Sequence, residues 1–295
     1  MRVFLTGATG FIGSRIVPEL LGAGHRVLGL ARSDAGARQL EAAGAEVHRG
    51  DLEQPDSLAS GAAQADAVIH TAFDHDFTRF AETCEKDRRA IEAMGGALVG
   101  SDRHFVITSG VGMGAREPGQ TATEDVVDWN SPFPRVTEHA GAAVAAKGVS
   151  VAVVRLPQVH DPVKQGLITP YIEVARAKGT AAYVGDGGNR LSAAHVLDVA
   201  RLYRLALERH EAGARYNAVA EEGVPMREIA QAVGAGLGVP VVSLTPEQAP
   251  AHFGWMAMFV GLDLAASSAW TRERLGWTPT GPALLADLKA MDYAA

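Results

Sequence analysis

Short apolar runs alternate with amphipathic stretches through the first half of the chain. The apolar runs predict buried strands at 2–5, 25–31, 46–49, 67–70, 104–108 and 149–155, and helical periodicity predicts helices at 10–22, 35–43, 77–98 and 135–147. Strands that alternate with helices of this length form parallel sheets with helices on both faces. The pattern therefore predicts an α/β fold with a doubly wound parallel sheet of the Rossmann type.

The pattern changes after Arg155. Pro157, Pro162 and Pro170 interrupt the next stretch, and helical patterns return at 196–208, 225–237 and 267–275. We expect residues 1–155 to form a dinucleotide-binding Rossmann domain. Residues 156–295 are expected to form, for the most part, a smaller α/β substrate-binding part that is interleaved with the Rossmann sheet.

A glycine-rich segment follows the first predicted strand and opens a helix, with the spacing Gly7-x-x-Gly10-x-x-Gly13. In such a loop the first glycine permits the tight turn, the second lets the pyrophosphate approach, and the third lets helix pack on strand. The N-terminus of the helix offers free N–H groups to phosphates. The alternative is a turn needed only for packing. We predict a dinucleotide-binding loop made of Gly7, Thr9, Gly10, Phe11, Ile12 and Gly13.

The residues after the second strand indicate which dinucleotide binds. Proteins that prefer NAD place an Asp or Glu there to bond the ribose 2′-hydroxyl, whereas this chain has Arg32 and Ser33. A guanidinium cannot accept a hydrogen bond from a hydroxyl, but it matches a 2′-phosphate. The sequence therefore favours NADP, and the alternative for Arg32 is a solvated surface charge.

Composition and charge exclude several other classes of protein. The net charge of −7 and pI near 5.8 give no global attraction to nucleic acid or to an anionic membrane. A single cysteine, Cys84, cannot form a disulfide framework. We find no signal peptide, no apolar window of transmembrane length and no histidine spacing typical of a metal site. We expect a cytoplasmic protein with no bound metal.

Several further motifs carry a family resemblance. The chain resembles the extended and atypical short-chain dehydrogenase/reductases, the group that includes NAD(P)-dependent epimerase/dehydratases. The resemblance covers nearly the whole length. Besides the glycine loop, it rests on Gly50-Asp51-Leu52, His70-Thr71-Ala72, Ile107-Thr108-Ser109, Arg155-Leu156-Pro157-Gln158-Val159, His195-Val196-Leu197-Asp198 and Arg274-Leu275-Gly276-Trp277-Thr278-Pro279.

The resemblance implies roles for residues at the ends of several strands. Asp51 and Leu52 would border the adenine, the segment Thr71, Ala72 and Phe73 would line the cofactor near its riboses, and Pro157 and Val159 would lie against the nicotinamide. Asp51 is equally typical of a turn. His70 is expected to be a core histidine, while Arg155 and Asp198 fit either structural bonds or ligand contacts.

The catalytic pattern of that family is incomplete here. Ser109 occupies the position of the catalytic Ser or Thr, but the Tyr-x-x-x-Lys pair is replaced by Pro134 and Glu138, and Asp87 stands where the family places an asparagine. A positioned general acid contributes about 10²–10⁴ in rate, so its loss weakens the argument for any one reaction. Other polar residues near the expected nicotinamide loops are Tyr171, Tyr183, His160, Lys164 and His195.

These features lead to three hypotheses of function. The first is an NADP(H)-dependent oxidoreductase that acts on a small, fairly apolar carbonyl or alcohol, with Ser109 contacting the substrate. The second is an epimerase or dehydratase that uses its cofactor transiently, and the third is a non-catalytic NADP-binding sensor. The aromatic and methionine-rich stretch 253–259 fits a substrate-site lining, ordinary core or a dimer surface. By resemblance, a homodimer would form through the helices at 77–98 and 135–147.

Overall fold

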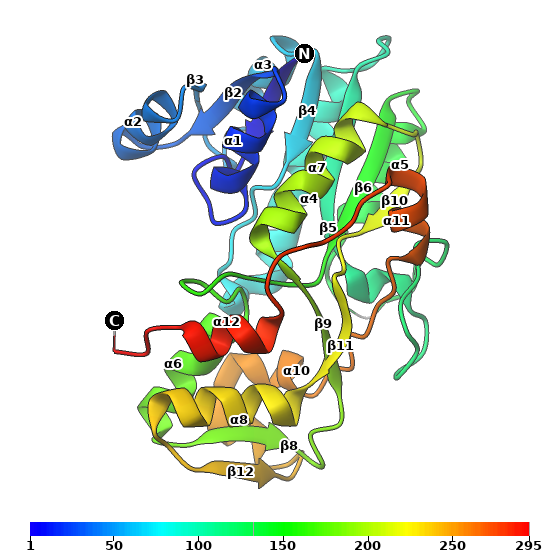
Figure 1. Cartoon of the computed structure of the whole chain (residues 1–295). Coiled ribbons are helices and arrows are strands. Elements are labelled where there is room, and N and C mark those ends of the chain that lie inside the picture. Colours follow the sequence, from blue (N-terminus) through cyan, green and yellow to red (C-terminus); the bar gives the residue numbers. More distant parts are fainter. Residues whose placement is uncertain (132, 295) are drawn as a thin grey trace.

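A parallel sheet organises the larger part of the molecule (Figure 1). The computed structural model describes residues 1–131 and 133–294, and within them seven strands pair in the order β10-β6-β5-β4-β1-β2-β3. Every neighbouring pair is parallel. The strands are β1 (Arg2–Thr6), β2 (Arg26–Ala31), β3 (Glu46–Arg49), β4 (Ala67–His70), β5 (His104–Gly110), β6 (Ser150–Leu156) and β10 (Arg215–Asn217). The expected doubly wound α/β fold is confirmed.

Helices cover both faces of this sheet because successive strand residues point to opposite sides. Val3 and Leu5 of β1 belong to the core under α1, α2 and α7, whereas Phe4 belongs to the core under α3, α4 and α5. The helices are α1 (Gly13–Gly22), α2 (Asp34–Ala42), α3 (Pro55–Ala63), α4 (Phe80–Gly96), α5 (Thr137–Ala145) and α7 (Val196–Glu208).

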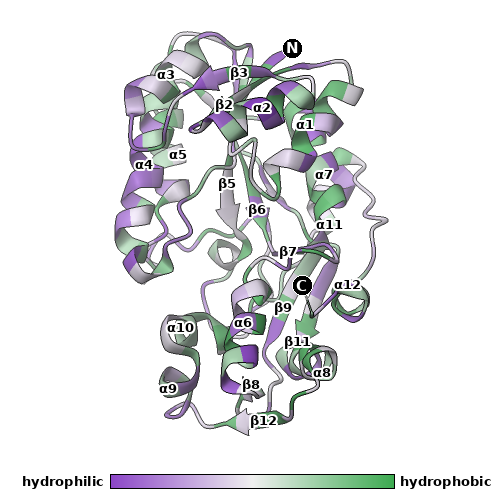
Figure 2. Ribbon diagram, turned by 90° about the vertical axis from the view of Figure 1, so that its left-hand side faces the viewer, coloured by the Kyte–Doolittle hydropathy of each residue, from purple (hydrophilic) through white to green (hydrophobic). Residues whose placement is uncertain are grey.

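A smaller α/β part lies beyond the carboxyl ends of the large sheet and has its own core (Figures 1 and 2). Its strands form the sheets β11-β9-β7 and β12-β8. Its elements are β7 (Gln158–His160), α6 (Ile168–Lys178), β8 (Ala181–Val184), β9 (Arg190–His195), β11 (Glu221–Pro225), α8 (Met226–Leu237), β12 (Val241–Leu244), α9 (Ala249–Phe253), η3 (Gly254–Met256), α10 (Ala257–Val260) and α12 (Leu284–Ala290).

The two parts exchange segments. The chain returns to the large sheet after β9, adding α7 to one face and β10 to the edge beside β6. A further helix, α11 (Ala269–Leu275), contacts β10. The division at residue 155 remains a prediction.

Several predicted helix bounds need correction. The helix expected at 77–98 begins as a 3₁₀ turn, η1 (Phe77–Arg79), because the Asp76 carboxylate accepts a bond from the Thr78 N–H, and α4 proper begins at Phe80. The helix expected at 135–147 begins two residues later, at Thr137. The sequence pattern did not reveal α3 and α6, although Pro55 at the first position of α3 is typical of a helix start. In the described part of the chain, no helix has both the length and the apolar character needed to cross a membrane.

Candidate cofactor and active site

The glycine loop joins β1 to α1 and is packed so tightly that side chains would not fit. Gly7 has a φ of 69°, in the left-handed region that favours glycine, and its carbonyl accepts a bond from the Gly10 N–H at 2.9 Å. A Cβ on Gly13 would lie 2.0 Å from the Gly7 carbonyl oxygen. The first turn of α1 therefore packs so closely on the loop that only glycine fits at position 13, as its predicted packing role requires.

The backbone at the end of this loop offers free donors. Across residues 1–131 and 133–294, the N–H groups of Phe11 and Ile12 have no protein acceptor. Helix α1 begins at Gly13 with no side-chain cap and no acidic residue in its first turn. Free N–H groups at an uncapped helix start suit an anion such as a pyrophosphate. Thr9 is half-buried in the same loop.

The residues predicted to choose between NAD and NADP lie together at the carboxyl end of β2. The Arg32 side chain is 82% exposed, and its Nε lies 3.8 Å from the Asp51 carboxylate. The Ser33 hydroxyl is already engaged, since it accepts a bond from the Gly36 N–H and caps α2. Leu52 is partly buried and packs against the core under α3. An exposed guanidinium at this position fits a 2′-phosphate.

The remaining predicted cofactor residues lie at the ends of β4 and β6. Thr71 donates its hydroxyl to the Thr6 carbonyl, and the Ala72 N–H donates to the Thr6 hydroxyl at 3.3 Å. Phe73 follows them in a half-buried position. Beyond β6, Pro157 is half-buried, whereas the Val159 side chain is 5% exposed and packs in the main core. Contact of these residues with a cofactor remains a prediction.

Ser109 lies near the carboxyl end of β5, in register with Arg155 of β6. It is 2% exposed, and its Oγ has no hydrogen-bond partner among the described residues. An unpaired buried hydroxyl costs free energy that a bound polar group would recover. This geometry is compatible with the predicted substrate contact.

The position of the family's lysine is occupied by a structural ion pair. Glu138 lies on α5 and its carboxylate accepts from Arg155 Nε at 2.8 Å and from Nη2 at 2.9 Å, with the two side chains 1% and 0% exposed. Arg215 of β10 adds a third bond at 3.0 Å. The sequence left Arg155 either a structural bond or a ligand contact, and the structure shows the structural bond. Glu138 cannot reach a cofactor while it holds this guanidinium.

A chain of hydrogen bonds, buried for most of its length, connects β1, the end of β4, α4 and α5. The Thr6 hydroxyl and Nδ1 of His70 lie 2.6 Å apart, and Nε2 of His70 lies 3.0 Å from the Asp87 carboxylate. Thr137 donates its hydroxyl to the other carboxylate oxygen, and Arg135 Nε donates to Thr137 at 3.1 Å. The expectation that His70 is a core histidine is confirmed.

The chain keeps a negative charge on Asp87. Burial alone would raise the pKa of this carboxyl, but the bond from His70, the charge of Arg135 and the bond from Thr137 together lower it. Because an ionised carboxylate can only accept hydrogen bonds, Nε2 of His70 is the donor to Asp87. The sequence pointed to Asp87 but gave no role to Arg135 or Thr137. Their only signal was that they lie in the segment 134–138, where the family has its Tyr-x-x-x-Lys pair.

The polar side chains proposed near the nicotinamide have different surroundings. Tyr171 is buried in the smaller core and donates its hydroxyl to the Ala182 carbonyl, and burial raises its pKa. His160 Nδ1 lies 2.7 Å from the Asp287 carboxylate on α12. Tyr183 is half-buried under Arg227, and Lys164 is exposed 5.8 Å from the Phe11 ring centre. His195 caps α7. Unlike that of Ser109, the Tyr171 hydroxyl is already bonded to both the carbonyl and the N–H of Ala182, so Tyr171 is not a free acid.

Aromatic side chains connect the loop after β4 with the smaller part. The Phe77 ring stacks on Trp255 with centroids 5.2 Å apart and planes 9° apart, and it meets Phe259 edge-on at 5.4 Å. Phe133 lies 6.3 Å from Phe259. We call Phe73, Phe77, Phe80, Phe133, Trp255 and Phe259 the aromatic cluster; all but Phe80 are partly exposed. Within the stretch 253–259, Phe253 and Met256 belong to the buried core, whereas Trp255 and Phe259 belong to the aromatic cluster.

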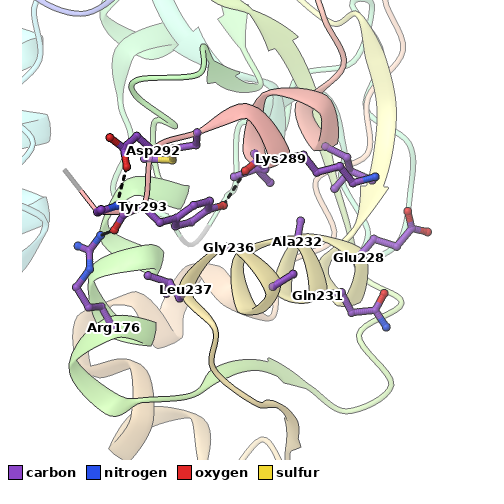
Figure 3. A pocket seen from close by; sticks show the side chains of 14 residues that line it. Arg176, Glu228, Gln231, Ala232, Gly236, Leu237, Lys289, Asp292 and Tyr293 are labelled. Carbon is purple, nitrogen blue, oxygen red and sulfur yellow. Dashed lines mark hydrogen bonds between the residues drawn. The ribbon is translucent and has the colours of Figure 1, made fainter.

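A hollow of about 1220 Å³ lies elsewhere, between α8 and the segment that follows α12 (Figure 3). Tyr293 projects across it and donates its hydroxyl to the Leu288 carbonyl, while Arg176 donates to the Tyr293 carbonyl. None of the predicted site residues lines this hollow. In the ranges that the structure describes, no group of three or more His, Cys, Asp or Glu side chains is arranged to hold a metal.

Comparison with known proteins identifies relatives of the whole chain. A model of the NAD dependent epimerase/dehydratase family matches residues 3–219. An uncharacterized protein of Schizosaccharomyces pombe is 44% identical over 295 residues, covering 99% of this chain and 100% of that protein. The 2-alkyl-3-oxoalkanoate reductase of Stenotrophomonas maltophilia is 30% identical over 263 residues, covering 82% of this chain and 77% of that enzyme.

Solved structures share the fold along its length. Human epimerase family protein SDR39U1 (isoform 2), crystallised with NADPH, has a TM-score of 0.73 at 21% identity, with 99% of each chain covered. The UDP-glucose 4-epimerase of Thermus thermophilus, in complex with NAD, also has a TM-score of 0.73 at 22% identity, with 100% of this chain and 99% of that one covered. At these identities the likeness shows the shared architecture.

Proposed function

Because the chain belongs to the NAD dependent epimerase/dehydratase family, we propose that it is an NADP(H)-dependent oxidoreductase of a small, fairly apolar carbonyl or alcohol. The observation that carries the proposal is the glycine cradle between β1 and α1, with an exposed Arg32 at the end of β2. The cradle fits a pyrophosphate, and the guanidinium fits a 2′-phosphate. The relative that reduces 2-alkyl-3-oxoalkanoates supports a reductase.

The residues around Ser109 suit this chemistry. When bound, the cofactor supplies or accepts the hydride. In the reductive direction, hydride adds to the carbonyl carbon, the C=O π pair moves to oxygen, and that oxygen takes a proton from solvent. The unpaired Ser109 hydroxyl would donate a hydrogen bond to the substrate oxygen. Positioning of the two reactants supplies about 7–11 kcal/mol of barrier reduction even without a tyrosine acid.

The missing catalytic pair weakens the epimerase or dehydratase hypothesis. Those reactions begin with oxidation of an alcohol, which requires a strong base. Pro134 carries no ionisable group, and Glu138 is held by Arg155 and Arg215. We therefore rank a net reductase above an enzyme that uses its cofactor transiently.

The proposal is tested by mixing the purified protein with NADPH or NADH and a panel of aryl and alkyl ketones, aldehydes and 3-oxo acids. We expect net oxidation of NADPH, with NADH a poorer donor. Isomerisation of a substrate without net redox change would replace the proposal with the epimerase hypothesis. Cofactor binding without turnover across the panel would leave a cofactor-binding sensor.

We further propose a cellular location and an oligomeric state for the protein. A small-molecule enzyme with this charge and composition is expected in the cytoplasm, without nucleic-acid or membrane partners. A homodimer through α4 and α5 is the expected assembly, and these two helices lie against each other on one face of the sheet. Sedimentation of the purified protein tests the dimer.

A further inference from the structure

We propose that Arg135 binds an anionic oxygen, a carboxylate, on a substrate whose apolar body rests on the aromatic cluster. This inference rests on the proposed function, because it names the substrate class of the same site. It gives a role to a guanidinium that neither the glycine loop nor Ser109 explains. It also predicts which carbonyl compounds are accepted: those that carry a carboxylate on an aryl or extended apolar body.

The first argument is that the charge of Arg135 has no direct counter-charge. Its Nη2 donates to the Thr108 carbonyl at 3.0 Å and its Nε to the Thr137 hydroxyl, and both acceptors are neutral. Among residues 1–131 and 133–294, no carboxylate lies within ion-pair distance of Arg135, and its Nη1 has no acceptor. Asp87 is one hydroxyl away, but His70 and Thr137 already bond its two oxygens. A half-buried cation in this state gains from an added anion.

The second argument is the position of the guanidinium. Thr108, whose carbonyl it contacts, directly precedes Ser109 on β5. The Phe73 ring, predicted to lie near the cofactor riboses, is 4.3 Å from the guanidinium carbon. Arg135 also follows Pro134, the position of the family's tyrosine. The free nitrogen of Arg135 thus belongs to the same few residues that are expected to face the reacting carbonyl.

The third argument is the chemistry of the surroundings. The aromatic cluster begins at Phe73 and continues through Phe77 to Trp255 and Phe259, and its partly exposed rings offer an apolar surface beside the cation. The guanidinium of Arg135 adds a positive charge beside this surface, although the chain carries −7 overall. His75 borders Phe73 and Phe77, and desolvation, followed by the charge of Arg135, lowers the pKa of its ring, while the Asp74 carboxylate acts to raise it. An apolar anion matches both properties.

The test is a binding measurement on the protein saturated with NADP⁺. Isothermal titration compares 3-phenylpropanoate with the neutral 3-phenylpropanamide, which has the same apolar body. We expect the carboxylate to bind at least about tenfold more tightly, as one charge-assisted bond of about 1.5–3 kcal/mol predicts. Arg135→Met should abolish this preference, Arg135→Lys should keep part of it, and the dissociation constant of NADPH should stay unchanged in both.

Lys289→Met is the matched control, since Lys289 is an exposed cation on α12, and it should behave as wild type. Equal affinity for the two probes in the wild type, or a preference that survives Arg135→Met in a protein that still binds NADPH, overturns the inference. Reduction of carboxylate-bearing aryl ketones at equal kcat/KM by wild type and Arg135→Met also overturns it, and leaves the proposed function standing. Conversely, an Arg135-dependent preference without NADPH oxidation on any carbonyl would reject only the proposed function.

Discussion

At the scale of single residues, Arg32 and Ser109 are available for ligands in different ways. Arg32 is exposed at the rim of the glycine cradle, so a bound phosphate would compete only with water and with the weak contact to Asp51. Ser109 is buried and without a partner among the described residues. A ligand would give Arg32 a stronger partner than Asp51 and would give Ser109 its first, and each residue can be tested by a single substitution.

Arg32→Asp is expected to raise the dissociation constant of NADPH about tenfold or more, because it removes a charge-assisted bond and places a carboxylate beside the 2′-phosphate. The dissociation constant of NADH should change much less. Fluorescence titration with both cofactors measures the effect. Lys289→Asp, at an exposed site on α12, makes the same change of net charge away from the cradle and should leave both dissociation constants unchanged. Equal losses for the two cofactors in Arg32→Asp would remove the assignment to NADP.

Ser109→Ala is expected to lower kcat/KM for the preferred carbonyl about tenfold or more, because the developing charge on the substrate oxygen loses a donor. The affinity for NADPH should not change, since the hydroxyl is assigned to the substrate. Ser60→Ala, at an exposed site on α3, provides the comparison. An unchanged kcat/KM in Ser109→Ala would show that the hydroxyl does not touch the substrate.

At the scale of elements, a buried ion pair fixes α5 against the edge of the sheet. Glu138 on α5 bonds Arg155 on β6 and Arg215 on β10, and further bonds from Arg155 reach the Thr123 and Val126 carbonyls. The Glu138–Arg155 pair thereby connects a helix, two strands and a loop. The sequence analysis assigns Glu138 to the position of the family's lysine, and in this fold its carboxylate has a structural role.

Glu138→Gln should lower the free energy of unfolding by about 3–5 kcal/mol, because it leaves the Arg155 charge buried without compensation. Urea unfolding followed by circular dichroism measures the change. Glu85→Gln is the control, since it breaks an ion pair with Arg88 at the surface, where little stability is expected to be lost. A Glu138→Gln protein as stable as wild type would mean that the buried pair adds nothing to folding.

At the scale of the whole molecule, the amino ends of the strands are joined to the end of α7 by two histidines. The His210 ring stacks on His104 at 4.2 Å, and its Nε2 bonds the Ser150 hydroxyl at 2.9 Å. Burial, and then the neighbouring His104, lower the pKa of His210 to about 4. The folded protein therefore keeps this ring neutral at a pH where the unfolded chain, with a pKa near 6.5, already binds a proton.

The free energy of unfolding should accordingly fall as the pH drops from about 6.5 towards 4, since the unfolded state takes up more protons in that range. His210→Gln should be less stable than wild type at about pH 7.5, but its stability should decline less between about pH 6.5 and 4.5. Chemical unfolding of both proteins at these pH values measures the difference. A constant gap between them would show that His210 does not titrate on unfolding.

The sequence by itself determined the alternation of strands and helices in the Rossmann part, apart from α3, together with the glycine loop and the incompleteness of the catalytic pattern. Each is a local property: hydrophobic period identifies strands and helices, and the loop lies within seven consecutive residues, from Gly7 to Gly13. Element ends were less certain, as at Phe80 and Thr137, because capping contacts decide them.

Only the tertiary structure decided which side chains share a site. Glu138 meets Arg155, Asp87 meets Thr137, and Phe77 meets Trp255 across long stretches of chain, and neither periodicity nor spacing specifies such contacts. These contacts depend on how the helices pack on the sheet. They also depend on the path of the chain, which leaves the large sheet after β6 and returns to it with α7 and β10. The importance of Arg135 follows from that packing: in the sequence it is one arginine among many, and in the fold its charge lies between Ser109's strand and the aromatic cluster.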